Sequence, residues 1–402
     1  MRPLASRIAA LSGEGALAVF TRARQLERAG RSVIHLELGE PDFHPAPPVL
    51  AAARRALDSG RDRYCPSAGI PELRQAVAEY LRCTRGVDAA PEQVLVAPGC
   101  KILLFMALLS LVEPGDGVLY PDPGFPAYAS LTRGLGGVPQ PFLLEESLGF
   151  QPDLAALEAQ ITPRTRVLML NFPGNPTGSV AGPACLEGLA RLAVAHDLFV
   201  VSDEIYARIV YGGQYRSIAS LPGMAERTVI VDGFSKSFAM TGWRLGYAVA
   251  PPELHRALDM LVMNSYTCVN EFVQCAAVEA LRDSTGAVEA MVAEFARRRD
   301  LFVDALNRIP GFRCLAPEGA FYAWVNVAGT GLAESAVAEI LLEEAGVAAV
   351  PGPAFGPGGA GFLRFSFASS VGQLEDAASR IAAVSSRWAP APAGAAPGAS
   401  RR

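Results

Sequence analysis

The chain has 402 residues, half of them hydrophobic, which is enough for one large domain or two of medium size. Its 35 basic and 40 acidic residues give a net charge of −5, so nothing general attracts nucleic acid or an anionic membrane. Seven cysteines without C-x-x-C spacing are typical of reduced thiols, and the four histidines lack the spacing of metal ligands. No signal-peptide core or membrane-length apolar run is present, and we therefore predict a soluble, cytoplasmic, metal-free protein.

The first part of the chain predicts helices joined by a crossing segment. A helix is expected over residues 12–30 and a short strand over 33–38. Prolines 45, 47 and 48 then interrupt regular structure before two further helices, at 48–59 and 72–82. We therefore expect residues 1–45 to pack with a smaller C-terminal domain.

From residue 94 onward, predicted strands and helices alternate. Apolar runs typical of buried strands occupy 94–96, 117–120, 167–170, 199–202, 228–231 and 246–249. Helices separate most of these runs, and such alternation predicts an α/β fold with a mainly parallel sheet covered on both faces. We assign this large domain to residues 46–282.

A smaller α+β domain is predicted for residues 283–388. It begins with a long helix at 288–309 and continues with strands at 321–327 and 362–367 and helices at 335–345 and 373–385. We expect the arginines at 297–299 to face water, with an anion site as the less favoured alternative. The Ala/Pro/Gly-rich tail, 389–402, is predicted to be disordered.

Lys236 marks the stretch around which the chain is organised. It follows the apolar strand 228–231 and an Asp-Gly pair, at a predicted carboxyl end of the sheet, where α/β proteins bind ligands. Among apolar neighbours a lysine has a lowered pKa, and its free amine can form an imine with a carbonyl group. A plain surface lysine in a loop is the alternative.

Other polar residues also follow predicted strands. Asp203 either caps a following helix or holds a protonated aromatic nitrogen, and Tyr206 could face the same cavity. Asn175 lies in a tight Asn-Pro turn and either belongs to a plain loop or offers its amide to a ligand. Arg364 interrupts an apolar strand, which indicates either a structural ion pair or a substrate carboxylate held by two hydrogen bonds.

Two further features indicate an anion site and a stacking surface. The Gly99-Cys100-Lys101 stretch opens a helix directly after a strand, so its free N–H groups and the helix dipole favour an anion. Arg244 could form a second, bidentate clamp on that anion. Phe125 could stack on a flat ring or simply belong to the core.

Seven stretches, in this order and spacing, resemble the pyridoxal-phosphate-dependent class I/II aminotransferases, of fold type I within the aspartate aminotransferase family. These are LELGEPDF (36–43), RYCPSAGIPELRQAV (63–77), NFPGNPTG (171–178), VSDEIY (201–206), GFSKSFAMTGWRLGY (233–247), PEGAFYAWV (317–325) and FLRFSFASS (362–370). The resemblance covers roughly residues 10–386. It implies a mainly parallel seven-stranded sheet flanked by helices, plus a smaller α+β domain.

The resemblance also implies a role for each matching residue. The implied catalytic residues are Lys236, which carries pyridoxal 5'-phosphate as a Schiff base and moves the proton, Asp203, which pairs with the ring nitrogen, and Tyr206, which with Asn175 bonds the ring hydroxyl. The implied contacts of ring and phosphate are Phe125, Gly99, Cys100, Lys101, Ser235 and Arg244, with Tyr64 from the neighbouring subunit of a homodimer. The implied substrate contacts are Arg364, Asn175 and the backbone at Gly39.

This chain departs from the family pattern at two of these positions. Gly233 stands where some relatives have serine, which leaves Ser235 as the nearer hydroxyl, and at Cys100 only the backbone is a safe expectation. No second cation is evident for a dicarboxylate side chain, so the sequence does not predict aspartate as the substrate.

The resemblance implies ping-pong transfer of an amino group between an L-amino acid and a 2-oxo acid. Because related sites also catalyse elimination, decarboxylation, carbon–carbon bond formation or ring closure, for example on S-adenosylmethionine, a lyase or cyclase remains the alternative. A DNA-binding regulator is disfavoured, since no basic segment precedes the domain.

Overall fold

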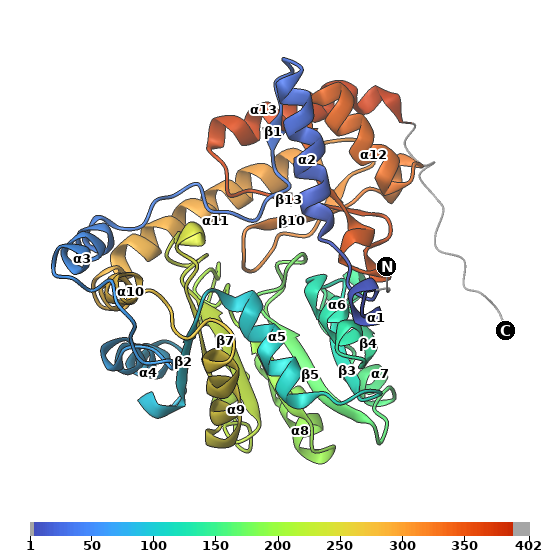
Figure 1. The fold of residues 1–402 in the computed structure, drawn as a ribbon. Helices are drawn as coiled ribbons and strands as arrows, with labels where there is room; N and C mark the ends of the chain where they lie inside the picture. Colours follow the sequence, from blue (N-terminus) through green and yellow to red (C-terminus); the bar gives the residue numbers. More distant parts are fainter. Residues whose placement is uncertain (1–3, 389–402) are drawn as a thin grey trace. The chain divides into compact units, whose positions relative to one another are not determined.

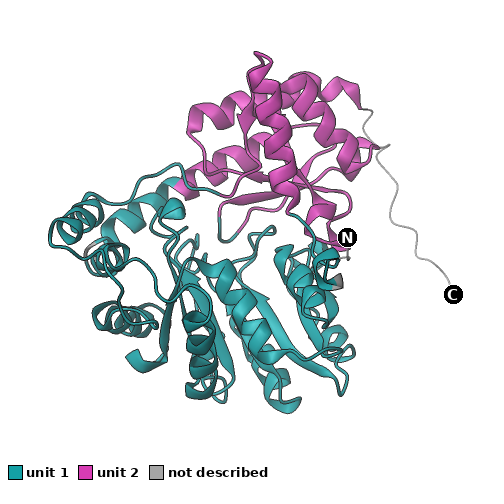
Figure 2. Cartoon of the chain, in the orientation of Figure 1, with its two compact units in different colours: residues 1–13, 40–294, 318–320 teal, residues 14–39, 295–317, 321–402 magenta. Residues whose placement is uncertain are grey.

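The computed structural model describes residues 4–388, which belong to two compact units (Figure 2). Unit 1 comprises residues 1–13, 40–294 and 318–320, and unit 2 comprises residues 14–39, 295–317 and 321–402. The tail at 389–402, for which we predicted disorder, lies outside the described residues. Within the described part, no helix is both long and apolar enough to cross a membrane.

A seven-stranded sheet forms the centre of unit 1 (Figure 1). Its strands are β2 (Val94–Ala97), β3 (Gly117–Asp122), β4 (Val138–Leu143), β5 (Thr165–Asn171), β6 (Phe199–Asp203), β7 (Thr228–Gly233) and β8 (Gly246–Val249). The order is β2-β8-β7-β6-β5-β3-β4, with β8 antiparallel to both neighbours and the other pairs parallel. The predicted mainly parallel sheet is confirmed, and so are the six strands expected from their apolar runs.

Helices cover both faces of this sheet because its strands are apolar on both sides. In β2, Val94 and Val96 belong to one buried cluster with residues of α4, whereas Leu95 and Ala97 belong to another with residues of α5. This alternation, with both sides apolar, is expected of strands inside an α/β protein. The helices of unit 1 are α1 (Ser6–Ala9), α3 (Pro47–Asp58), α4 (Pro71–Arg85), α5 (Cys100–Leu111), α6 (Ala127–Gly134), α7 (Leu154–Glu158), α8 (Pro183–Ala195), α9 (Pro252–Met263) and α10 (Glu271–Asp283).

The seventh strand, β4, has a sequence that hardly predicts a strand. It contains Pro139 and Pro141, and a proline cannot donate to a ladder of hydrogen bonds. Their positions are compatible with a strand because β4 lies at the end of the sheet order and pairs with β3 alone.

Unit 2 is the smaller α+β part that the resemblance implied. Its antiparallel sheet has the order β12-β13-β10-β9, and a separate parallel pair joins β1 to β11. The strands are β1 (Ile34–His35), β9 (Arg313–Cys314), β10 (Tyr322–Asn326), β11 (Val347–Ala348), β12 (Val350–Pro351) and β13 (Phe362–Ser366). The helices are α2 (Gly15–Arg28), α12 (Glu334–Ile340), α13 (Val371–Val384) and the part of α11 (Thr285–Asn307) from residue 295 onward.

Two predictions for unit 2 need correction. The strand expected over 33–38 pairs as β1 only at Ile34–His35, although the Leu36 N–H still bonds the Ala348 carbonyl. The arginines at 297–299 do not all face water, because Arg298 is only 6% exposed and its guanidinium carbon lies 5.8 Å from the centre of the Phe295 ring. One helical turn separates these two side chains, so the guanidinium can lie over the aromatic ring.

Candidate active site

The carboxyl ends of β5 and β6 bring two predicted site segments together in unit 1. Asp203 ends β6 and lies directly opposite Asn171, the last residue of β5. The Asn171 amide donates to the Asp203 carbonyl over 3.1 Å and accepts the Asn175 N–H over 2.9 Å. The sheet register therefore fixes Asn175, which is 8% exposed, close to Asp203.

The Asp203 carboxylate is buried and receives hydrogen bonds from neutral groups. Tyr128 donates its hydroxyl over 2.8 Å and the Ile205 backbone donates its N–H over 3.3 Å. Burial raises the pKa of Asp203 to about 7, and the two hydrogen bonds oppose that rise. Residues 205–208 form a turn, not a helix, so the helix-cap alternative for Asp203 is wrong. A cation beside this carboxylate would offset the cost of burying its charge.

Tyr128 is a site residue that the sequence interpretation missed. It lies on α6 and is fully buried, and its ring meets that of Phe125 edge-on, with centroids 5.7 Å apart. The Lys101 amine lies 5.5 Å from the centre of the Phe125 ring. The available signal was a phenol one helical turn after Phe125, the aromatic residue expected to stack, together with the need of a buried Asp203 for a hydrogen-bond donor.

Several predicted side chains act electrostatically on one thiol, Cys100. Burial raises the pKa of Cys100, Asp203 and Asp232 raise it further, and Lys236 and Arg244 lower it. Groups that affect the titration of this thiol lie within a short range of it. The structure thus places Lys236, from the turn after β7, Asp203 and Arg244 around Cys100.

Two more predicted residues are buried in the same part of unit 1. Tyr206 is 4% exposed and contributes to the raised pKa of Tyr128, which places it near the Tyr128–Asp203 pair. Ser235, immediately before the lysine, is 8% exposed.

The start of α5 has the geometry of an anion site. Gly99 precedes the helix with φ of +96° and, as a glycine, has no side chain that could cap the first N–H groups. A Cβ at Gly99 would collide with the Arg244 guanidinium, whose Nη1 donates to the Thr241 carbonyl over 2.8 Å. Glycine at 99 therefore lets the backbone approach the guanidinium and keeps the helix start open.

Gly233 is also explained by close packing of backbones. A Cβ there would lie 2.8 Å from the Cα of Gly246 and 3.0 Å from the Cys100 sulfur. A serine in this position would not fit without movement of β8. The departure from some relatives thus follows from how tightly β7, β8 and the start of α5 meet in this chain.

In unit 2, Arg364 and Gly39 both contact Tyr322. The Arg364 guanidinium carbon lies 4.4 Å from the centre of the Tyr322 ring and 4.7 Å from that of Phe355, and its Nη2 donates to the Glu37 carbonyl. A Cβ at Gly39 would collide with the Tyr322 hydroxyl. Arg364 is only 4% exposed, and its guanidinium lies close to two aromatic rings and bonds a backbone carbonyl, which restrict its movement.

Tyr64, predicted to serve a neighbouring subunit, lies between α3 and α4 and is 87% exposed. A phenol so exposed is available to a second molecule.

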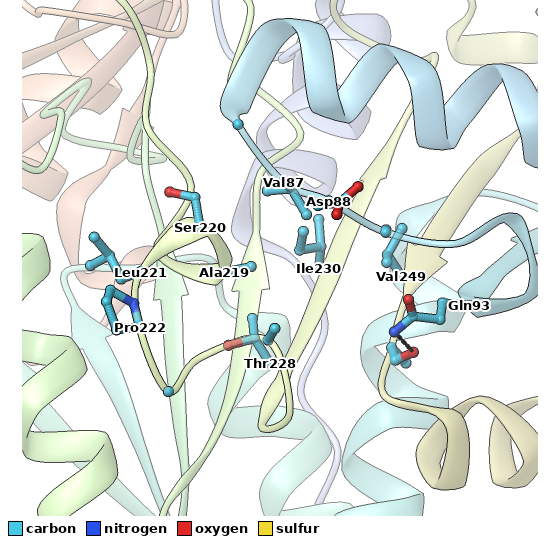
Figure 3. A pocket seen from close by; sticks show the side chains of 15 residues that line it. Val87, Asp88, Gln93, Ala219, Ser220, Leu221, Pro222, Thr228, Ile230 and Val249 are labelled. Atoms are coloured by element: carbon cyan, nitrogen blue, oxygen red, sulfur yellow. Dashed lines mark hydrogen bonds between the residues drawn. The ribbon is translucent and has the colours of Figure 1, made fainter.

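A separate hollow in unit 1, with a volume of ≈ 350 Å³, does not coincide with the predicted site (Figure 3). Thr228, the first residue of β7, lines it together with Val249, the last residue of antiparallel β8. Lys236 follows the carboxyl end of β7, whereas the hollow lies at the amino end of this strand. The hollow and the predicted site are therefore at opposite ends of the strands.

Comparison with known proteins identifies the family. The model of aminotransferase class I and II matches residues 31–381. The aspartate/prephenate aminotransferase of Thermus thermophilus is 41% identical over 392 residues, 96% of this chain and all of that protein. The aromatic-amino-acid aminotransferase 2 of Thermococcus litoralis is 42% identical over 356 residues, 88% of this chain and 91% of that protein.

Solved structures agree. The aspartate aminotransferase of Thermus thermophilus with maleate superposes with a TM-score of 0.92 at 40% identity, covering 96% of this chain and 100% of that one. The alternative of a lyase or cyclase finds no support among these relatives, which are named as aminotransferases. By the extent of the match and by its fold, the chain belongs to the class I and II aminotransferases.

Proposed function

We propose that this aminotransferase uses pyridoxal 5'-phosphate to move an amino group between an L-amino acid and a 2-oxo acid by ping-pong kinetics. The observation that carries the proposal is the buried Asp203, with a pKa raised to about 7 and neutral hydrogen-bond donors. Such a carboxylate suits a ring nitrogen that must stay protonated. The open helix start beside Arg244 suits the phosphate of the same cofactor.

When bound, the cofactor supplies an aldehyde for the amine and an electron-accepting ring. The chain's residues supply the rest. Asp203 would keep the ring nitrogen protonated. Lys236 would hold the cofactor through its aldehyde carbon and, once the amino group of the substrate has displaced it, would use its free amine to move the proton at the substrate Cα. Asn175 and Tyr206 orient the ring through its hydroxyl, and Phe125 covers one ring face.

We assign separate sets of residues to the phosphate of the cofactor and to the carboxylate of the substrate. The phosphate binds the backbone of Gly99, Cys100 and Lys101 and the side chains of Ser235 and Arg244. Arg364 binds the substrate α-carboxylate with two parallel hydrogen bonds, assisted by Asn175 and the backbone at Gly39. The burial of its guanidinium beside two aromatic rings supports this role.

We further propose a homodimer in which the exposed Tyr64 reaches the phosphate of the neighbouring subunit. We assign the enzyme to the cytoplasm, and its seven free cysteines support a reducing compartment.

The experiment that tests this function is a half-reaction screen. The purified yellow enzyme is mixed with single L-amino acids, beginning with acidic and aromatic ones, and conversion of the cofactor is followed by absorbance. We expect conversion with at least one amino acid and its reversal by a 2-oxo acid. Conversion that no 2-oxo acid reverses would contradict amino transfer.

The sequence contains two lysines, Lys101 and Lys236, which makes the attachment site easy to test. Borohydride reduction and peptide mass spectrometry should place the adduct on Lys236. Lys236→Ala should lower turnover by at least ~10⁴-fold while some cofactor stays bound. Lys101→Ala, the matched variant, should weaken cofactor binding but retain turnover at saturating cofactor. Near-wild-type turnover of Lys236→Ala would rule out its role.

A further inference from the structure

A buried ionic cluster lies beside the proposed catalytic residues but is not among them. It consists of Arg85, Glu204 and Asp232, whose side chains are 1%, 0% and 4% exposed. Arg85 is the last residue of α4, and its Nη1 donates to Glu204 over 2.8 Å while its Nη2 donates to Asp232. One guanidinium thus joins two carboxylates, one directly after β6 and one within β7.

The two carboxylates flank the two residues to which we assign the chemistry. Glu204 directly follows Asp203 at the end of β6, and its N–H bonds the Val231 carbonyl of β7. Asp232 lies four residues before Lys236, and its Oδ1 accepts the Gly233 N–H over 2.6 Å. Any shift of Arg85 would therefore move both strand ends.

The other carboxylate oxygens of the cluster also have donors, which makes it a connected network. Ser202 and Ser217 donate their hydroxyls to Glu204 Oε1 over 2.9 and 2.6 Å. Tyr247 donates its hydroxyl to Asp232 Oδ2 over 2.7 Å. Two carboxylates held in this way have well-defined positions, because each oxygen would lose a partner on moving.

Aromatic rings enclose the guanidinium and keep water away from it. The Arg85 Cζ lies 5.6 Å from the centre of the Tyr80 ring and 5.7 Å from that of Tyr215. In such surroundings the charges of the cluster act strongly on near neighbours. Glu204 and Asp232 both contribute to the raised pKa of Asp203, and Arg85 is the cation that compensates them.

We infer that Arg85 is a positioning residue for amino transfer: through Glu204 and Asp232 it fixes the ends of β6 and β7 and compensates two negative charges that would otherwise act on Asp203. The inference rests on the role proposed for Asp203. It makes Arg85 part of the machinery that keeps Asp203 ionised, by balancing the charges of Glu204 and Asp232, although none of the three has an assigned contact with cofactor or substrate.

The decisive measurement is the pH dependence of cofactor affinity, obtained by titrating the apoenzyme with pyridoxal 5'-phosphate at each pH. Affinity should fall as the pH drops through the pKa of Asp203. Arg85→Met leaves two uncompensated carboxylates nearby and should move the midpoint of this fall up by about one pH unit. Asp232→Asn removes one of those charges and should move it down. Arg85→Lys keeps the charge and should restore most of the wild-type midpoint.

Arg82→Met is the matched control. Arg82 lies on the same helix, is 57% exposed, and its nearest carboxylate is that of Asp88 at 3.9 Å. This variant should keep the wild-type midpoint, with kcat/KM within about twofold, whereas Arg85→Met should lower kcat more than tenfold with KM changed less than threefold.

The inference is overturned if the midpoint of Arg85→Met equals that of Arg82→Met, or if Arg85→Met and Asp232→Asn shift it in the same direction. If Arg85→Met does not fold, Asp232→Asn decides: a midpoint below that of the wild type supports the inference, and an unchanged or higher midpoint overturns it. Cofactor affinity needs no amino donor, so these outcomes are separate from failure of the wild type to transfer amino groups.

Discussion

Three buried carboxylates of unit 1 have two kinds of partner. Glu204 and Asp232 share a resident cation, Arg85, which bonds one of them through Nη1 and the other through Nη2. Asp203, next to Glu204 in sequence, receives hydrogen bonds from the neutral groups of Tyr128 and Ile205, and burial raises its pKa to about 7. The difference distinguishes structural carboxylates from one that is suited to a cationic ligand. Glu204 and Asp232 have a cation within the fold, whereas Asp203 is held in place by neutral groups and its charge is costly to bury.

The strongest test of this contrast is Asp203→Asn. The amide keeps the size of the side chain but cannot hold a ring nitrogen protonated, so we expect kcat to fall by ~10²–10⁴-fold. Stopped-flow kinetics of the half-reaction would measure the loss. Glu204→Gln, one residue away, keeps Asp203 and should lose far less. Equal losses in the two variants would erase the distinction between the two carboxylates.

Arg364→Lys extends the contrast to a buried cation in unit 2. A lysine cannot reproduce two parallel hydrogen bonds to a carboxylate, and losing one charge-assisted bond corresponds to a rise in KM of ~10–100-fold. Steady-state kinetics with the best amino donor would show it. Arg380→Lys, which alters a partly exposed arginine paired with Asp376, is the control and should leave KM unchanged.

Gly99→Ala tests the anionic end of the proposed cofactor site. The new methyl group would collide with the Arg244 guanidinium, and φ of +96° is unfavourable for alanine. Strain of about 1–2 kcal/mol should weaken the affinity for pyridoxal 5'-phosphate by about tenfold. Gly242→Ala meets no atom within 4 Å and should bind as the wild type does. Indistinguishable affinities would show that the approach of Gly99 to Arg244 is unimportant.

Tyr128→Phe should give the smallest effect. Its hydroxyl stabilises the ionised form of Asp203, so removing it should raise the pKa of that carboxyl above about 7. A rise of about one unit would lower the ionised fraction at pH 7 from about one half to about one tenth, an approximately fivefold loss of cofactor affinity. The loss should vanish as the pH rises well above the new pKa, because both enzymes are then ionised. Tyr120→Phe is the control, and a loss independent of pH would contradict the account.

The sequence predicted the sheet well because six of its strands are apolar on both faces. It did not predict β4, since Pro139 and Pro141 are compatible with a strand only at an edge, and edge position is a property of the assembled sheet. It predicted that Arg298 faces water, because a run of charges does not reveal that one member lies over Phe295.

The residues of the proposed site also differ in how well the sequence predicted them. Residues in family-like stretches, such as Asp203 and Lys236, could be proposed from their place after strands. Tyr128 could not be assigned before α6 and β6 were placed together, since 75 residues separate it from Asp203. The Arg85 cluster was missed for the same reason, because its members lie 119 and 147 residues apart in sequence.

The prolines of β4 also bear on how the protein behaves at high concentration. An edge strand with free N–H groups is a template on which another molecule can add its own strand, and chains joined in this way aggregate. Pro139 and Pro141 remove two of these donors at one end of the seven-stranded sheet. The edge is thereby protected from growth, and association of copies is directed to other surfaces of the molecule.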